Sequence, residues 1–209
     1  MAFGLLLRSS TMFRNADRMN LMVGSGRIRI LLIALLISGG DSLLAQEIYK
    51  ADSSEIRFFS STPIENIEAT NSTSTSLLNL ARNEVSFRVP ISGFVFDKSL
   101  MQEHFNENYM EAEKFPYATF KGKLSDTLDL CKDTVYHISA TGLMNIHGVD
   151  QANTYNGIIQ SNDGKATLTC EFKVALADHN IKVPSVVFAN IAKEIEVKAT
   201  FYYVPFEHE

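Results

Sequence analysis

Apolar and polar residues alternate along much of the chain after residue 50. The strictest alternation covers residues 84–91, 117–124, 135–146, 165–174 and 194–204. Because successive side chains of a β-strand point to opposite faces, this pattern predicts five strands that each bury one face. Weaker alternation predicts further strands around residues 55–60, 64–70 and 153–160. Strands with one apolar face are typical of an antiparallel sheet with its other face in water.

Turn-forming residues separate the predicted strands at short intervals. They include Gly93, Asp126, Asp133, His147-Gly148 and Asn162-Asp163-Gly164. About eight antiparallel strands at this spacing form either a closed barrel or a sandwich, so the fold class is all-β. The inward faces mix large residues with Ala and Gly. A wide barrel with an apolar lumen accommodates this mixture, and so does a filled core in which large and small side chains interdigitate.

Residues 99–112 interrupt the alternation and predict one short helix between two strands. Its apolar stripe consists of Met101, Phe105 and Tyr109. A glutamate stands at every fourth position from Glu103 to Glu111, on a second face. We expect Asp97 or Ser99 to cap the N-terminus, and Pro116 follows the end of the helix. The apolar stripe should face the barrel and the glutamates should face water.

A metal site on this helix is an alternative interpretation. His104 could share an ion with Glu107 and Glu111, as histidine–carboxylate pairs on helices do. The second histidine of the HExxH motif is missing, however, and the glutamates form the face that any solvated helix shows. We therefore predict no metal, no cofactor and a structural, hydrogen-bonded His104.

Nucleophilic and phosphate-binding motifs are also missing. The sequence has no G-x-S-x-G elbow and no Gly-rich run before a helix, and neither cysteine has a histidine beside it. His147, at a predicted turn, is interpreted as a residue that satisfies backbone groups. We predict no catalytic residues and therefore no enzymatic activity.

Residues 1–45 resemble a secretory signal peptide. Arg27 and Arg29 precede the eight apolar residues Ile30–Ile37, and Ser38-Gly-Gly40 and then Leu43-Leu-Ala45 follow, with a small residue at the end. Eight residues are too few to span a bilayer, which takes about 20. We expect cleavage after Ala45, a mature domain of residues 46–209, no stable membrane insertion, and a periplasmic or secreted protein.

The charge of the mature chain limits its partners. The first 45 residues contain five Arg and two Asp, so 14 basic and 22 acidic residues remain of the 19 and 24 in the whole chain, a net charge of −8. Nucleic acids and anionic membrane surfaces attract Lys and Arg, so we predict neither as a partner. The sequence is compatible with a homodimer.

Two cysteines, Cys131 and Cys170, are too few for a disulfide scaffold. Cys170 lies on the same face as Leu168 and Phe172, which predicts a buried apolar thiol. A bond between the two cysteines is left open.

Four segments, in this order, resemble the YceI-like family. They are Phe94-Val-Phe96 with Leu100–Met110, then Phe115-Pro-Tyr-Ala-Thr-Phe-Lys-Gly122, then Thr141-Gly-Leu-Met-Asn-Ile-His-Gly-Val149, and finally Ala177-Asp178 with Ile181 and Pro184. The similarity covers about residues 50–205. Met144 departs from the pattern, because many members have Thr there.

The resemblance implies a lipocalin-like antiparallel barrel, usually exported, with an apolar cavity that binds a long isoprenoid chain such as a polyprenyl phosphate or a quinone tail. No catalytic residues are carried over from the family. From the inward faces we predict a ligand-binding cavity lined by Phe87, Phe120, Leu124, Tyr136, Ile138, Met144, Leu168, Phe172 and Phe201. We expect His104, Asn106 and Tyr109 at the cavity mouth, where they could bind a polar head group.

The sequence thus predicts a carrier that encloses a polyisoprenoid, quinone tail or fatty acyl chain in a barrel lumen. Two alternatives stay open: a metal-assisted enzyme that uses His104 and nearby glutamates, and a non-catalytic envelope protein whose barrel is fully packed.

Overall fold

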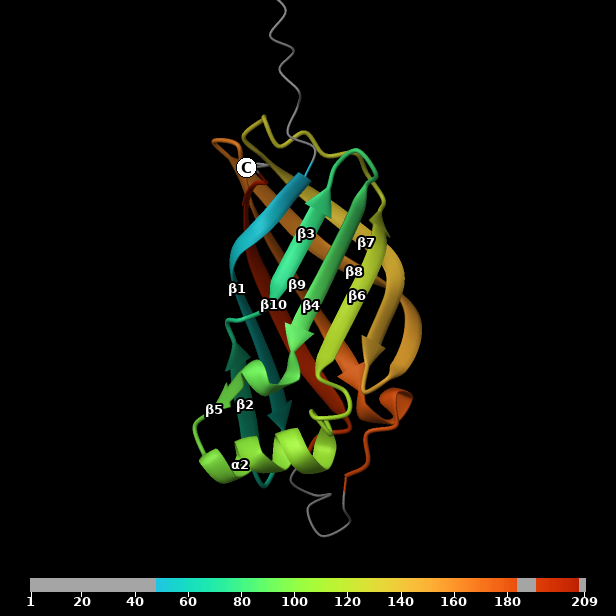
Figure 1. The fold of residues 1–209 in the computed structure, drawn as a ribbon. Coiled ribbons are helices and arrows are strands. Elements are labelled where there is room, and N and C mark those ends of the chain that lie inside the picture. The colour runs from blue at the N-terminus through green and yellow to red at the C-terminus, as the bar shows by residue number, and fades with distance from the viewer. Residues whose placement is uncertain (1–47, 184–190, 207–209) are drawn as a thin grey trace, which may run out of the picture. The chain divides into compact units, whose positions relative to one another are not determined.

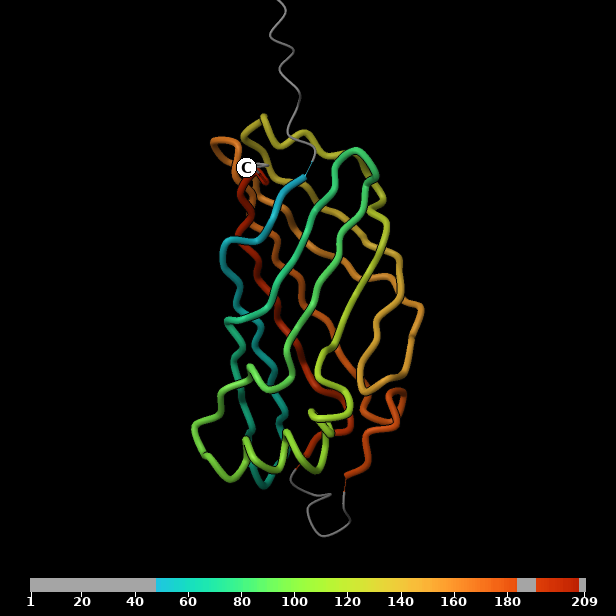
Figure 2. The backbone as a smooth tube through the Cα atoms, in the orientation of Figure 1, coloured from blue at the N-terminus to red at the C-terminus, as the bar shows by residue number. Residues whose placement is uncertain are grey.

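The computed structural model describes residues 48–183 and 191–206 (Figures 1 and 2). Every described residue belongs to one compact unit, Ala45–Glu209. The predicted signal peptide and its cleavage site lie outside the described residues.

Eight strands close into an antiparallel barrel. The strands of the described ranges are β1 (Ile48–Ser61), β2 (Asn66–Asn71), β3 (Thr75–Asn79), β4 (Glu84–Pro90), β5 (Phe94–Phe96), β6 (Tyr117–Leu124), β7 (Thr134–Ile146), β8 (Val149–Asn162), β9 (Lys165–Ala175) and β10 (Glu194–Pro205). The order β1-β3-β4-β6-β7-β8-β9-β10 returns to its start, because β10 pairs with β1. Closure satisfies the backbone groups at both edges of the sheet. The predicted barrel is confirmed, and the sandwich is excluded.

The remaining two strands extend the sheet beside the barrel. The first residues of β1, Ile48–Lys50, pair with β3, whereas its last residues, Ile56–Ser61, pair with β2. β5 then pairs with the other edge of β2. Sequence alternation did not predict β3 or β5, since they are only five and three residues long.

The predicted helix is present but differs in its ends. Helix α2 covers Ser99–His104 and continues as one π-helical turn, η2, over Phe105–Tyr109. The N-cap residue is Lys98, which makes no side-chain cap hydrogen bond, so the predicted caps Asp97 and Ser99 are wrong. Short 3-10 turns, η1 (Ile91–Gly93) and η3 (Leu176–His179), follow β4 and β9.

The inward faces agree with the alternation. Phe120 and Leu124 of β6, Leu168 and Cys170 of β9, and Phe201 of β10 are all buried in one core. β6 and β7 approach closely where Gly122 pairs with Gly142. A Cβ atom on Gly142 would lie 2.1 Å from the main-chain oxygen of Lys121, so this glycine permits close backbone packing and does not make room for a ligand.

The connection from β2 to β3 begins at a buried asparagine. Asn71 is fully buried, and its Nδ2 donates to the carbonyl oxygen of Pro90 at 2.7 Å. Its Oδ1 accepts from the backbone N–H of Thr73 and from the hydroxyl of Ser74. Asn71 therefore ties the end of β2 to the end of β4.

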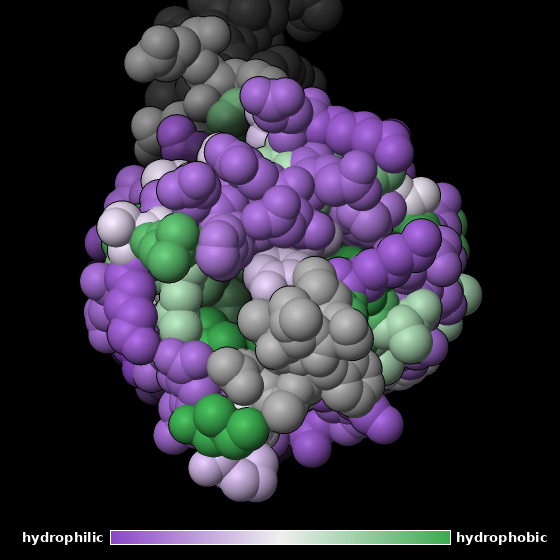
Figure 3. All heavy atoms as spheres, turned by 90° about the horizontal axis from the view of Figure 1, so that it is seen from below, coloured by the Kyte–Doolittle hydropathy of each residue, from purple (hydrophilic) through white to green (hydrophobic). Residues whose placement is uncertain are grey.

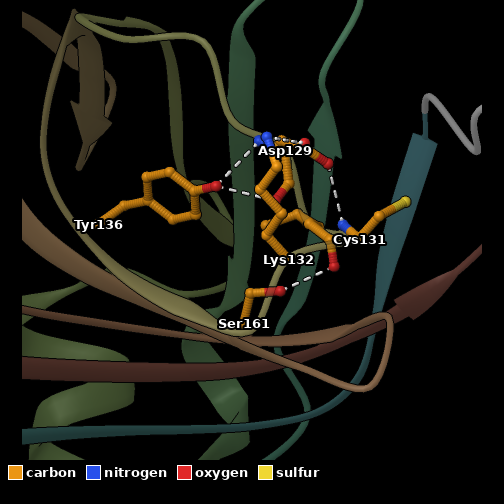
Figure 4. A network of polar contacts seen from close by, with 6 residues as sticks. Asp129, Cys131, Lys132, Tyr136 and Ser161 are labelled. Atoms are coloured by element: carbon orange, nitrogen blue, oxygen red, sulfur yellow. Dashed lines mark hydrogen bonds and ion pairs between the residues drawn. The ribbon is translucent and has the colours of Figure 1, made fainter.

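The loop between β6 and β7 closes one end of the barrel. It places Leu128 and Leu130 in the core, where each is almost fully buried. Tyr136 Oη donates to the carbonyl oxygen of Asp129 at 2.8 Å, and Ser161 Oγ donates to that of Leu130 at 2.8 Å (Figure 4). These bonds hold the two leucines as a plug, with Cys131 and Lys132 on the outside.

Candidate functional site

The other half of the barrel encloses a cavity of about 470 Å³. Apolar side chains of β1, β4, β6, β7, β9 and β10 form its walls, among them Ile56, Val89, Ala118, Ile146 and Val197. The cavity lies within the size range of small-molecule binding sites in proteins. A lumen is therefore present, which argues against the fully packed barrel.

The cavity opens beside α2. Three of its lining residues, Lys98, Leu100 and His104, are exposed to solvent and lie on α2 or just before it. Lys98 Nζ forms an ion pair with Glu65 Oε1 at 2.9 Å across this opening. Figure 3 views the molecule from this end and shows hydrophobic residues in a recess that hydrophilic residues border.

Aromatic side chains anchor the helical segment over the cavity. The ring of Phe105 stacks on Phe58 of β1 at 5.5 Å between centroids. It also meets Phe96 at 5.1 Å and Phe94 at 5.6 Å, both on β5. Met101, Phe105 and Tyr109 all line the cavity, so the predicted orientation of the apolar stripe is confirmed.

Of the nine residues predicted to line a cavity, the structure places five on its walls. These are Phe87, Phe120, Met144, Phe172 and Phe201.

The other four lie beyond the cavity, towards the closed end. Leu124, Ile138 and Leu168 are buried in the packed core, and Tyr136 bonds to the plug loop. They share the inward face with the five, but they stand nearer the closed end of the barrel, where other side chains fill the lumen.

Two of the three predicted mouth residues border the cavity. His104 and Tyr109 line it, and burial raises the pKa of the Tyr109 hydroxyl. Asn106 is not part of the lining, and its Oδ1 is buried without a hydrogen-bond partner.

The acidic face of the helix does not assemble around His104. Glu111 Oε2 instead lies 2.8 Å from His147 Nε2, and His147 Nδ1 faces the carbonyl oxygen of His179 at 3.1 Å. His147 thus satisfies a backbone group, as predicted. No group of three or more His, Cys, Asp or Glu side chains in residues 48–183 and 191–206 is placed to hold a metal ion.

Several lining residues were missed from the sequence. Phe94 and Phe96 alternate with Val95, but a three-residue run is too short to be recognised as a strand. Phe58 lay in a weakly alternating segment next to Phe59, so its inward direction was unclear. Val197 and Ala199 alternate with polar residues in the last predicted strand but were not included in the predicted lining.

Both cysteines are free thiols, Cys131 exposed and Cys170 buried. Burial raises the pKa of Cys170 to about 11. The predicted buried thiol is confirmed, and the cysteines are not bonded to each other.

Solved structures with this fold are known. A polyisoprenoid binding domain from Saccharophagus degradans, implicated in plant cell wall breakdown, aligns over 76% of this chain and 98% of its own, at 14% identity and a TM-score of 0.63. BcnA from Burkholderia cenocepacia aligns over 71% and 95%, at 13% identity and 0.61. The Campylobacter jejuni YCEI protein aligns over 71% and 90%, at 14% identity and 0.54. At these identities the likeness concerns the fold.

The fold and the site define a closed antiparallel barrel with an apolar cavity open at one end. The YceI-like domain model matches residues 49–203, so this chain belongs to the YceI-like family. The resemblance drawn from the four sequence segments is confirmed. No curated protein sequence matches the chain. Among the described residues, none of the helices is long and apolar enough to cross a membrane.

Proposed function

We propose that this protein is an exported carrier that holds the apolar chain of a lipid in its cavity. The observation that carries this proposal is the apolar, one-ended lumen beside α2. The relative from Saccharophagus degradans, a polyisoprenoid binding domain with the same fold, supports an isoprenoid chain as the ligand. A quinone tail or a fatty acyl chain has the same apolar chemistry.

The driving force is the removal of apolar surface from water, about 25 cal/mol per Å². A free alkyl or prenyl chain exposes its whole length, whereas a chain in the lumen contacts side chains such as Val89, Met144, Phe172 and Val197. The protein would lower the free energy of a chain outside a membrane without forming any covalent bond to it.

A polar head group would stay at the mouth. Tyr109 and His104 supply hydrogen-bonding groups there, and Lys98 supplies a positive charge next to Glu65. These three donors suit a head group that carries oxygen atoms, such as a phosphate, a carboxylate or a hydroxyl. Their proposed role is to hold the head group.

Export is the second part of the proposal, and it rests on residues 1–45. If it is right, protein recovered from the envelope or medium of the source organism begins at Gln46, as N-terminal sequencing would show. Recovery of an uncleaved chain from the cytoplasm would contradict it.

Binding is tested by titrating the purified protein with a fluorescent long-chain fatty acid. We expect saturable, one-to-one binding that a prenyl alcohol displaces. Val197→Gln places an amide among the apolar walls and should weaken binding at least tenfold. Lys198→Gln introduces the same residue on the outward face of β10 and should leave binding unaltered. Equal weakening by both variants, or no binding by the wild type, would overturn the proposal.

A further inference from the structure

The cavity ends at a row of aromatic rings that crosses the lumen. Phe201 stacks on Phe87 with centroids 4.7 Å apart and planes 11° apart, and Phe87 stacks on Phe120 at 5.6 Å. Tyr155 continues the row to Phe172, at 5.5 Å from Phe120 and 4.8 Å from Phe172. We call these five residues, contributed by β4, β6, β8, β9 and β10, the aromatic belt.

Beyond the aromatic belt the barrel is filled. Val85, Ile159 and Leu168 lie there in the same core, together with the plug leucines Leu128 and Leu130. Among the described residues, the cavity lining reaches Phe87, Phe120 and Phe201 but includes none of the five core residues beyond the belt. A chain that enters beside α2 therefore meets the belt at its tip and finds no space behind it.

The volume of the cavity sets how much chain fits. A methylene group takes up about as much space as a water molecule, whose share of liquid volume is about 30 Å³. A cavity of about 470 Å³ then holds about fifteen chain carbons. Further carbons would remain at the mouth or in water.

We propose that Phe87 and Phe201 form the floor of the cavity and limit the buried part of the ligand to about fifteen carbons. This inference rests on the proposed function. Each methylene that enters the cavity should tighten binding about fourfold, until the chain reaches the floor. Longer chains should gain nothing more, so that affinity against chain length rises and then levels off.

Two substitutions should move this plateau in opposite directions. Phe87→Ala removes one ring of the floor and should let at least two more methylenes enter, so that a twenty-carbon chain binds at least tenfold more tightly. Ala199 is 3% exposed and lines the cavity between Ile56 and Cys170, two residues from Phe201 on the mouth side of the floor. Ala199→Leu should shorten the plateau by about three carbons, the number of heavy atoms it adds. Leu168→Ala, behind the belt, is the matched control and should leave the plateau in place.

The experiment measures displacement of the fluorescent fatty acid by straight-chain alcohols of eight to twenty-four carbons. Circular dichroism first establishes that each variant is folded, and the Ala199→Leu variant decides the question if Phe87→Ala does not fold. A plateau that moves as described supports the proposal. Affinity that rises through the whole series, or a plateau unmoved in the folded variants, overturns the length limit and leaves the proposed function standing. Failure of every alcohol and of the fatty acid to bind overturns both.

Discussion

His147 and Glu111 join two segments that the sequence keeps far apart, with Nε2 of the imidazole 2.8 Å from Oε2 of the carboxylate. The carbonyl oxygen of His179 can only accept a hydrogen bond, so Nδ1 of His147 carries a proton towards it. The pair fastens the loop after η2 to the turn between β7 and β8, near the cavity.

A double-mutant cycle should detect this pair. We expect His147→Ala and Glu111→Ala to show a coupling free energy of about 1 kcal/mol in urea unfolding, because the imidazole side chain is only 9% exposed. Lys198 and Glu171 form a pair of the same length, 2.8 Å, between two well-exposed side chains, and their coupling should stay below about 0.5 kcal/mol. Equal couplings for the two pairs would show that the His147 contact is no stronger than a surface ion pair.

Phe105 should hold the helical segment over the cavity. Phe105→Ala removes the ring that contacts Phe58, Phe94 and Phe96, and should lower the free energy of unfolding by about 2–3 kcal/mol. It should also speed the release of a bound fluorescent chain in stopped-flow measurements. Leu100→Ala, in the same segment but 60% exposed, should change stability by less than about 0.5 kcal/mol. If both variants release the chain at the wild-type rate, the segment does not control access to the cavity.

Gly142 should resist substitution more strongly than other strand glycines. Its Cβ would meet backbone atoms of Lys121 and Gly122, which cannot rotate away, so Gly142→Ala should cost about 2–3 kcal/mol in chemical unfolding. Gly157→Ala is the control, because the nearest atom, the main-chain oxygen of Thr169, lies 3.1 Å away. A cost for Gly142→Ala no larger than that for Gly157→Ala would mean that β6 and β7 are further apart than described.

Cys170 should make stability fall in alkaline solution. Burial raises the pKa of its thiol from 9.0 to about 11, so between these values the unfolded chain loses a proton that the folded chain keeps. The stabilisation that the protonated thiol gives to the folded state is complete below pH 9 and is lost as the pH rises towards 11. At pH 10.5 the free energy of unfolding has fallen by about 2 kcal/mol for this reason.

Comparison with Cys170→Ala isolates this effect from the tyrosines, whose pKa values burial also raises. Between pH 8 and pH 10.5 the wild type should lose about 2 kcal/mol more than the variant in urea unfolding. A thiol reagent at pH 8 should modify the exposed Cys131 at once and Cys170 only after unfolding. Equal pH dependence of the two proteins, or rapid modification of both thiols, would contradict the buried state.

The sequence indicated on which face of the sheet a side chain lies, but not how far along the barrel axis it stands. Alternation placed Phe120 and Leu124 on one face of β6, and both are buried. It could not tell that Phe120 borders the cavity while Leu124 lies beyond it, because position along a barrel depends on the stagger of all the strands. The plug residues Leu128 and Leu130 sit in a loop without period, so nothing in the pattern revealed that they fill the far end.

The ends of the helix and the contact partners of its side chains could not be predicted from the sequence either. The spacing of Met101, Phe105 and Tyr109 correctly gave the stripe that faces the cavity. The change to a π-helical turn at Phe105 and the partner of Glu111 both depend on tertiary contacts, with β5 and with His147, that local sequence does not encode.

Native mass spectrometry of the protein, purified without detergent from the source organism, shows whether the barrel carries a lipid. We expect a fraction of molecules with one noncovalently bound lipid, whose mass after organic extraction identifies an isoprenoid, quinone or fatty acyl chain. The Val197→Gln variant, purified alongside, should carry much less of it. Protein that is repeatedly recovered empty, and that takes up no fluorescent chain when one is added, would contradict a lipid-carrying role.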